Sequence, residues 1–91
     1  MTLSTGQIIN NRYRIVRRLN QGGFGAVYRA WDLNISAPCA LKENFDTSPE
    51  AMRQFAREAT ILANLHHPNL PRVTDHFSIP GQGQYLVMDY V

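Results

Sequence analysis

The sequence predicts an α+β fold in which a five-stranded antiparallel sheet carries one main helix. β-rich runs, separated by glycine and proline turns, occur on both sides of the middle of the chain. The middle itself holds one apolar pattern with a helical period. A chain of 91 residues, 44% of them hydrophobic, has room for one compact domain around one core.

The N-terminal half predicts three of the strands. Residues 1–11 are mostly polar, so we expect a short tail before the first strand. The glycine-containing turn at 20–25 joins the first two β-rich runs as a hairpin, and a loop at 32–38 leads to the third. The predicted strands of this half are 13–19, 26–31 and 39–43.

One helix is predicted at 52–65, because apolar residues recur there at steps of three and four. Thr47 or Ser48 is the expected N-cap, with Pro49 and Glu50 in the first turn. The apolar positions are Met52, Phe55, Ala59, Leu62 and Leu65. After the helix, residues 72–79 and 85–91 predict two more strands, joined by a turn at 80–83.

No apolar run approaches the roughly 20 residues that cross a bilayer, and residues 1–10 lack the pattern of a secretory signal. We therefore expect a soluble, cytoplasmic protein with no membrane partner. Cys39 is the only cysteine, and its neighbours Pro38 and Ala40 predict a buried, unreactive side chain. No metal site is expected, because the adjacent His66 and His67 would point about 100° apart on a helix end.

Nine basic and seven acidic residues leave a net charge of only +2, which is weak support for a nucleic-acid partner. Arginines do cluster near the first strand, but they interleave with apolar residues as on a solvated strand. A small basic β-domain that binds nucleic acid is therefore the lowest-ranked function. Eight of the nine basic residues are arginine, so Lys42 is the only lysine.

Gly22, Gly23 and Gly25 predict a loop whose backbone can approach a phosphate closely, although such a cluster also occurs in plain hairpin turns. A dinucleotide-binding loop would open a helix, whereas this loop opens a strand. A P-loop would place Gly-Lys before Ser or Thr, and Lys42 stands 17 residues beyond Gly25. What remains is a glycine flap over a following strand.

Lys42 and Ala40 share one face of the predicted third strand, because side chains alternate along a strand. If Val27 faces the same way, Val27 and Ala40 form an apolar roof for a planar base, with Lys42 beside the phosphates. The alternative for Lys42 is a solvated cation near a strand end.

Glu58 projects onto the apolar face of the predicted helix. A carboxylate packed against a sheet needs a partner, and Lys42 is the candidate. The alternative is that Glu58 lies at the edge of the stripe and pairs with Arg53 or Arg57.

These segments resemble the N-terminal lobe (N-lobe) of eukaryotic-type protein kinases, in particular the bacterial serine/threonine kinases. The resemblance rests on Leu19 to Tyr28 for the glycine-rich loop, on Ala40-Leu41-Lys42, and on Glu58 to Leu70 for helix C and its exit. Residues 85–91 resemble the last strand and the hinge. The resemblance implies a tail at 1–11 and a kinase N-lobe at 12–91, truncated at the hinge with the C-lobe absent.

The resemblance also implies site residues. Lys42 would hold the α- and β-phosphates and pair with Glu58, and these two would be the catalytic positions. Leu62 and Val73 would be spine-like core positions. The implied ATP-binding residues are Leu19, Asn20, Gln21, Gly22, Gly23, Phe24, Gly25, Val27, Ala40, Lys42, Met88, Asp89 and Val91. One departure is Asn20 in place of the family's first loop glycine; asparagine tolerates positive φ, but the departure predicts lower nucleotide affinity.

The parent protein would then transfer the ATP γ-phosphate to serine or threonine of a protein substrate, which the missing C-lobe would bind together with the Mg²⁺ ions. The family's catalytic-loop and metal-binding motifs are absent from these 91 residues, so the fragment alone is expected to be inactive. The alternative is a non-catalytic nucleotide-binding or protein-interaction module. The uncovered lobe surface also predicts self-association.

Overall fold

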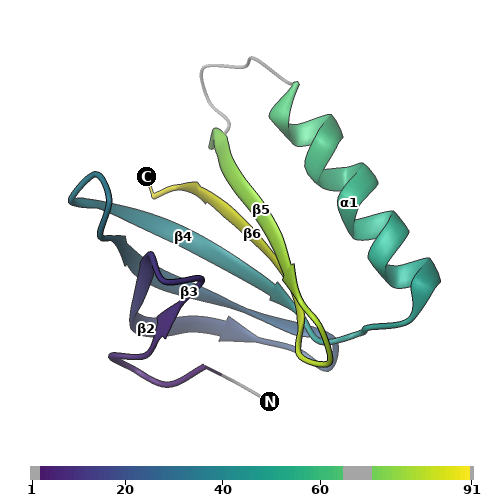
Figure 1. Ribbon diagram of the computed structural model, residues 1–91, viewed down its shortest axis with the longest axis horizontal. Helices are drawn as coiled ribbons and strands as arrows, with labels where there is room; N and C mark the ends of the chain where they lie inside the picture. The colour runs from purple at the N-terminus through teal and green to yellow at the C-terminus, as the bar shows by residue number, and fades with distance from the viewer. Residues whose placement is uncertain (1–2, 65–70, 91) are drawn as a thin grey trace.

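The computed structural model describes residues 3–64 and 71–90, which form one antiparallel sheet and one helix (Figure 1). The predicted fold class is confirmed, with six strands instead of five. The elements are β1 (Ile8–Ile9), β2 (Tyr13–Gln21), β3 (Gly25–Asp32), β4 (Ala37–Asn44), α1 (Pro49–Ala63), β5 (Val73–Ile79) and β6 (Gly83–Asp89).

The strands lie in the order β1-β2-β3-β4-β6-β5, and every neighbouring pair is antiparallel. The chain leaves the sheet after β4, forms α1, and returns at the edge as β5 before β6 inserts beside β4. Helix α1 runs alongside the β5 edge of the sheet, where it contacts β5 and β6 (Figure 1). The side of the sheet that α1 covers is called the helix face below.

The sixth strand, β1, lies within the segment 1–11 that the sequence predicts to be a tail. It pairs with the start of β2, and in the three-residue turn between them Asn10 and Asn11 both have φ of 54°. Asparagine tolerates this left-handed conformation better than most residues. Ile9 and Leu3 are buried in the main core. The prediction of a tail is therefore wrong for the described part of this segment, because its few apolar side chains are enough to pack it on the sheet.

Helix α1 begins where its cap chemistry predicts. Ser48 is the N-cap, and its hydroxyl accepts a hydrogen bond of 3.3 Å from the backbone N–H of Ala51, with Pro49 in the first turn. The helix buries Phe55 and Ala59 against the sheet. It ends at Ala63, two residues before the predicted end, and the predicted positions from Leu65 to Leu70 lie outside the described residues.

Strand register fixes which side chains share the helix face. Val27 pairs with Lys42, and Lys42 pairs in turn with Leu86. Directly paired residues of antiparallel strands project to the same side. Leu86 packs against α1, so Val27 and Lys42 lie on the helix face, and Ala40, two residues before Lys42, lies there too. The predicted common face of these residues is confirmed.

The opposite side of the sheet, called the tyrosine face below, holds the larger core. Its most deeply buried residues include Tyr28, Leu41, Tyr85 and Val87, none of which is measurably exposed. Cys39 belongs to the same cluster, which confirms the prediction of a buried thiol. Burial raises the pKa of the Cys39 thiol to about 11.

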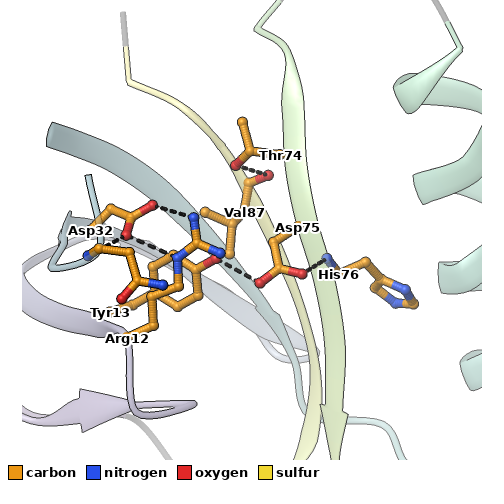
Figure 2. Close-up of polar contacts among 8 residues, drawn as sticks. Arg12, Tyr13, Asp32, Thr74, Asp75, His76 and Val87 are labelled. Carbon is orange, nitrogen blue, oxygen red and sulfur yellow. Dashed lines mark hydrogen bonds and ion pairs between the residues drawn. The ribbon is translucent and has the colours of Figure 1, made fainter. Parts of the chain in front are cut away.

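The sheet curls around the tyrosine face, so that strands far apart in sheet order make contact. The hydroxyl of Tyr13 in β2 donates a 2.6 Å hydrogen bond to Asp75 in β5 (Figure 2). Beside it, Arg12 donates two hydrogen bonds of 2.9 Å to the buried carboxylate of Asp32. These bonds hold the pKa of Asp32 below its usual value. None of the described helices is long and apolar enough to span a bilayer.

Candidate functional site

The turn between β2 and β3 is held tightly against the end of β4. The N–H of Gly22 donates a 2.8 Å hydrogen bond to the carbonyl of Gly25, which closes the turn. The carbonyl of Phe24 accepts a 2.8 Å hydrogen bond from the N–H of Phe45, just beyond β4. Gly25 lies so close to the carbonyl oxygen of Glu43 that a Cβ would not fit. Glycine is required here because the two backbones meet directly.

Beneath this turn lies a cavity of about 580 Å³, called the hairpin cavity below. It is bounded by the β2–β3 turn, the end of β4 and the first half of α1. Its lining residues are Asn20, Gln21, Gly22, Gly23, Phe24, Gly25, Ala26, Val27, Lys42, Glu43, Asn44, Asp46, Ala51, Gln54, Phe55 and Glu58. Ligand sites for small molecules have volumes of about 300–1,000 Å³, so the hairpin cavity is large enough for a nucleotide.

Of the predicted nucleotide-binding residues, 20–25 and Val27 all line the hairpin cavity. Lys42 lines it from β4, where its side chain is exposed. Phe24 is 78% exposed at the tip of the turn. Phe24 therefore borders the hairpin cavity while most of its side chain faces solvent.

Glu58 also lines the hairpin cavity, but its setting differs from the prediction. Its side chain is exposed, and it accepts a 3.3 Å hydrogen bond from the Nε2 of Gln54 one turn earlier. Over residues 3–64 and 71–90, no ion pair joins Glu58 to Lys42. The expectation that Glu58 is packed against the sheet is therefore wrong. Phe55 and Ala59 occupy the buried stripe and leave the Glu58 carboxylate on its cavity side.

Four of the predicted nucleotide-binding residues do not line the hairpin cavity. Ala40 and Met88 are paired across β4 and β6 on the helix face, both half-buried. Leu19 lies at a register shift in β2 and is 37% exposed. Asp89 forms a 3.3 Å ion pair with Arg72. Val91 lies outside the described residues.

A small apolar cluster connects α1 to the sheet beside these residues. The predicted core positions Leu62 and Val73 pack with Met88 against the buried residues of α1 and β6. Their core placement is confirmed. Met88 therefore contributes both to the packing under α1 and to the helix face.

The prediction missed several lining residues at the β4–α1 connection. Asn44, Asp46, Ala51 and Gln54 all border the hairpin cavity. Asp46 accepts a 2.9 Å hydrogen bond from the N–H of Ser48, and this contact lowers the pKa of its carboxyl. The signal in the sequence was the position of the helix start, only five residues after β4, which forces the first turn of α1 close to the glycine turn.

The described residues include no group of three or more His, Cys, Asp or Glu side chains that could hold a metal ion. The cavity is lined by one cation, Lys42, by the glycine turn, by apolar strand residues, and by the acidic residues Glu43, Asp46 and Glu58. Cation and backbone N–H groups are the partners that phosphate oxygens prefer, and a flat apolar surface suits an aromatic base.

The chain is similar to known proteins in sequence. The family model described as protein tyrosine and serine/threonine kinase matches residues 13–91. The chain is similar to the probable serine/threonine-protein kinase YbdM of Bacillus subtilis, with 36% identity over 98% of this chain and 36% of that protein. It is also similar to the serine/threonine-protein kinase PknA of Mycobacterium tuberculosis, with 35% identity over 100% of this chain and 23% of that protein.

The fold is similar to solved structures as well. A double mutant of the PknI kinase domain from Mycobacterium tuberculosis superposes with a TM-score of 0.82 and 31% identity, over 100% of this chain and 36% of that one. The structure titled PpkA-294 apo form gives a TM-score of 0.81 with 25% identity, over 98% of this chain and 38% of that one. The chain thus spans about a third or less of the length of the curated relatives named here.

Proposed function

Because this chain belongs to the protein tyrosine and serine/threonine kinase family, we propose that it is the ATP-binding N-lobe of a serine/threonine kinase. The lobe is assigned to residues 12–91, with the described part of 1–11 packed on it as an extension. The observation that carries the proposal is the hairpin cavity, where the glycine turn, the only lysine and Glu58 all line one space.

In this proposal the phosphates of ATP lie under the β2–β3 turn. Lys42 approaches them from β4, and the backbone of Gly23 and Phe24 covers them from above. A hydrogen bond to a charged group contributes about 1.5–3 kcal/mol. Lys42 is therefore the side chain from which we expect the largest single contribution to phosphate binding.

The base of ATP would occupy the helix face next to the hairpin cavity. Val27 and Ala40 would contact one side of the ring, as the register of β3 and β4 allows. Met88 would limit the depth of this base-binding site, and Leu19 would close its outer edge. The N–H of Asp89 already donates a 2.9 Å hydrogen bond to the carbonyl of Arg72. We therefore propose the Asp89 carbonyl, and not its N–H, as the group that contacts adenine.

We propose that Glu58 pairs with Lys42 when nucleotide is bound. Both side chains line the hairpin cavity, and only Gln54 holds Glu58 in the described structure. The main contacts of α1 are with β5 and β6, so α1 can shift relative to β4 with little loss of packing. The pair would hold the Lys42 ammonium in a fixed position against the phosphates.

Phosphoryl transfer to a protein substrate is proposed for a longer protein that contains this chain. The hairpin cavity fits ATP in size, and Lys42 offers a cation to the phosphates, although Asp46 and Glu58 also line it. The described residues supply no cluster of metal ligands. We expect Mg²⁺ to be held by the phosphates and by ligands outside this chain, where it would neutralise charge at the γ-phosphate. The 91 residues alone are expected not to transfer phosphate.

The nucleotide site is tested by titrating MgATP against this chain, monitored by the amide NMR spectrum. We expect shifts at Gly23, Gly25 and Lys42, with an affinity at least ~10-fold weaker in Lys42→Met, a loss of about 1.4 kcal/mol. Arg53→Met is the matched control, because it removes an exposed cation of α1 that does not line the hairpin cavity. Absence of specific shifts in the wild-type chain would refute the nucleotide site.

The second candidate function is a non-catalytic nucleotide-binding or protein-interaction module. It is favoured by the exposed side chain of Glu58 and by Asn20 at the start of the glycine turn. A phosphate-transfer assay on a longer protein containing this chain, with serine and threonine peptides, separates the two. Transfer that Lys42→Met abolishes supports the kinase, and nucleotide binding without transfer supports the module.

We also propose that the isolated chain self-associates. Phe24 and Ile61 are large apolar side chains that are 78% and 55% exposed. Exposed apolar surface of this kind favours association. Light scattering over a concentration series tests it, and a strictly monomeric chain at high concentration would contradict it.

A further inference from the structure

Glu43 is a buried acidic side chain that the proposed nucleotide chemistry does not use. It is 1% exposed and lies on the tyrosine face, between strands β3 and β6. One carboxyl oxygen accepts a 2.9 Å hydrogen bond from the hydroxyl of Tyr28, and the other accepts one of 2.7 Å from the hydroxyl of Tyr85. Over the described residues no cation pairs with it. The carboxyl group is therefore held by hydroxyl donors alone.

Each of these hydroxyls is fixed in turn by a further donor. Tyr28 accepts a 2.9 Å hydrogen bond from the backbone N–H of Leu3, and Tyr85 accepts one of 2.7 Å from the Nε2 of Gln82. Both tyrosine hydroxyls thus donate to Glu43 and accept from a second donor, so the direction of each of the four hydrogen bonds is determined. Burial raises the pKa of Tyr28 to about 12 and also raises that of Tyr85, so both remain donors at neutral pH.

The same residue touches the candidate site through its backbone. Glu43 follows Lys42 directly, so the two side chains project to opposite faces of β4. Its carbonyl oxygen lies against Gly25, and its strand partner in β3 is Ala26. The side chain is anchored on the tyrosine face, while the main chain supports the glycine turn above the hairpin cavity.

An apolar side chain would pack at this position without the cost of burying a carboxyl group. Hydrogen bonds to both carboxyl oxygens add something that apolar packing does not, namely a fixed direction and depth for this part of β4. Any slip or twist of β4 at Glu43 would move Lys42 on one side and the support of Gly25 on the other.

We propose that Glu43 is a positioning residue for the nucleotide site: anchored by Tyr28 and Tyr85, it holds the end of β4 where Lys42 and the glycine turn can contact phosphate together. This inference rests on the proposed ATP site. It differs from a stability role because it requires nucleotide affinity to change separately from the free energy of unfolding.

The test measures MgATP affinity by NMR and unfolding by urea in two variants of Glu43 and in a control variant. Glu43→Gln keeps the shape but turns one acceptor into a donor facing a tyrosine hydroxyl. Glu43→Met fills the site with an apolar side chain of similar length. We expect both to bind MgATP about tenfold more weakly, because a shift of β4 would weaken the charge-assisted contact of Lys42 with the phosphates.

Tyr13→Phe is the matched control. It removes a buried tyrosine hydrogen bond of the same face, to Asp75, without touching Glu43. We expect it to lower stability and to leave MgATP affinity unchanged. If Glu43→Met unfolds no more easily than wild type yet still loses affinity, positioning is supported directly. If neither Glu43 variant folds, the Tyr28→Phe, Tyr85→Phe double variant keeps the carboxyl group and removes the two hydroxyls that anchor it, which are also the acceptors for Leu3 and Gln82. The same loss of MgATP affinity is expected.

The outcomes separate the two proposals. Wild-type affinity in the folded Glu43 variants, together with lost affinity in Lys42→Met, would overturn the positioning role and leave the ATP site standing. Affinity that falls in proportion to stability across all variants, Tyr13→Phe included, would also overturn it. No specific binding by the wild-type chain would overturn both.

Discussion

Gly25 and the carbonyl oxygen of Glu43 are in direct backbone contact, with no room for a side chain between them. Gly25→Ala should therefore push the β2–β3 turn away from β4. Forcing an extra carbon into a packed site costs about 1–3 kcal/mol. Urea unfolding followed by circular dichroism measures the loss of stability, and the MgATP titration measures the accompanying loss of affinity.

Gly23→Ala is the matched control for this substitution. Gly23 lies in the same turn, but a Cβ there would meet no atom within 4 Å, and its φ is not positive. A change at such a surface position is usually within about 0.5 kcal/mol. Equal destabilisation by the two alanines would show that the close contact at Gly25 does not hold the turn.

The fold itself was largely predictable, since the elements with strong patterns were found in the right order. The helix, the glycine turn and the second hairpin follow from apolar period and turn residues. Strand β1 was missed because it has only two residues. Its signal was the pair Asn10-Asn11 directly after Ile8-Ile9, because asparagine is common in turns and tolerates positive φ.

The site was predictable at the level of which elements meet, but less so in its side-chain contacts. The period of α1 placed Glu58 within the apolar stripe, yet the rotation of a helix on a sheet is decided by packing. Here Phe55, Ala59 and Leu86 form that contact. The part played by Glu43 could not be predicted, because its tyrosine partners come from strands 15 and 42 residues away.

Acid should destabilise the protein through Asp32. Its two hydrogen bonds from Arg12 lower the pKa of the Asp32 carboxyl in the folded chain. As the pH falls, Asp32 is therefore protonated first in the unfolded chain. The stabilisation is complete above the unfolded pKa of about 3.9 and is lost as the pH falls through the folded pKa. Urea unfolding at pH 7 and pH 3 measures this loss.

Asp32→Asn is the comparison for the acid experiment. At pH 7 it should be less stable by about 1–3 kcal/mol, because charged hydrogen bonds are removed from a buried group. Its stability should also fall less steeply between pH 7 and pH 3 than that of the wild type. Parallel curves for the two proteins would mean that Asp32 does not carry the acid dependence.

Alkali should destabilise the protein through the buried tyrosines. Burial raises the pKa of Tyr28 to about 12, while an exposed tyrosine ionises near 10. Because the pKa of the Tyr28 hydroxyl is higher in the folded than in the unfolded chain, the contribution of Tyr28 to the free energy of unfolding is complete below about pH 10. This contribution is lost as the pH rises towards 12. Absorbance at 295 nm reports the ionisation, and Tyr28→Phe should flatten the fall in stability over this range.

The N-cap of α1 can be tested with neighbouring hydroxyl residues. Ser48→Ala removes the side-chain acceptor for Ala51 and should cost about 1 kcal/mol. Thr47→Ala is the control, because Thr47 is exposed and does not cap the helix. Thermal unfolding by circular dichroism compares them, and a larger effect at Thr47 would move the helix start by one residue.

The single thiol of Cys39 lies deep in the tyrosine-face core, with a pKa raised to about 11. Only the thiolate reacts with alkylating reagents, so Cys39 in the native chain is protected both by coverage and by protonation. Its rate of modification by iodoacetamide therefore reports how often the core around Cys39 opens. A ligand that binds the native state would lower this rate, so Cys39 serves as a built-in probe of stability and of ligand binding.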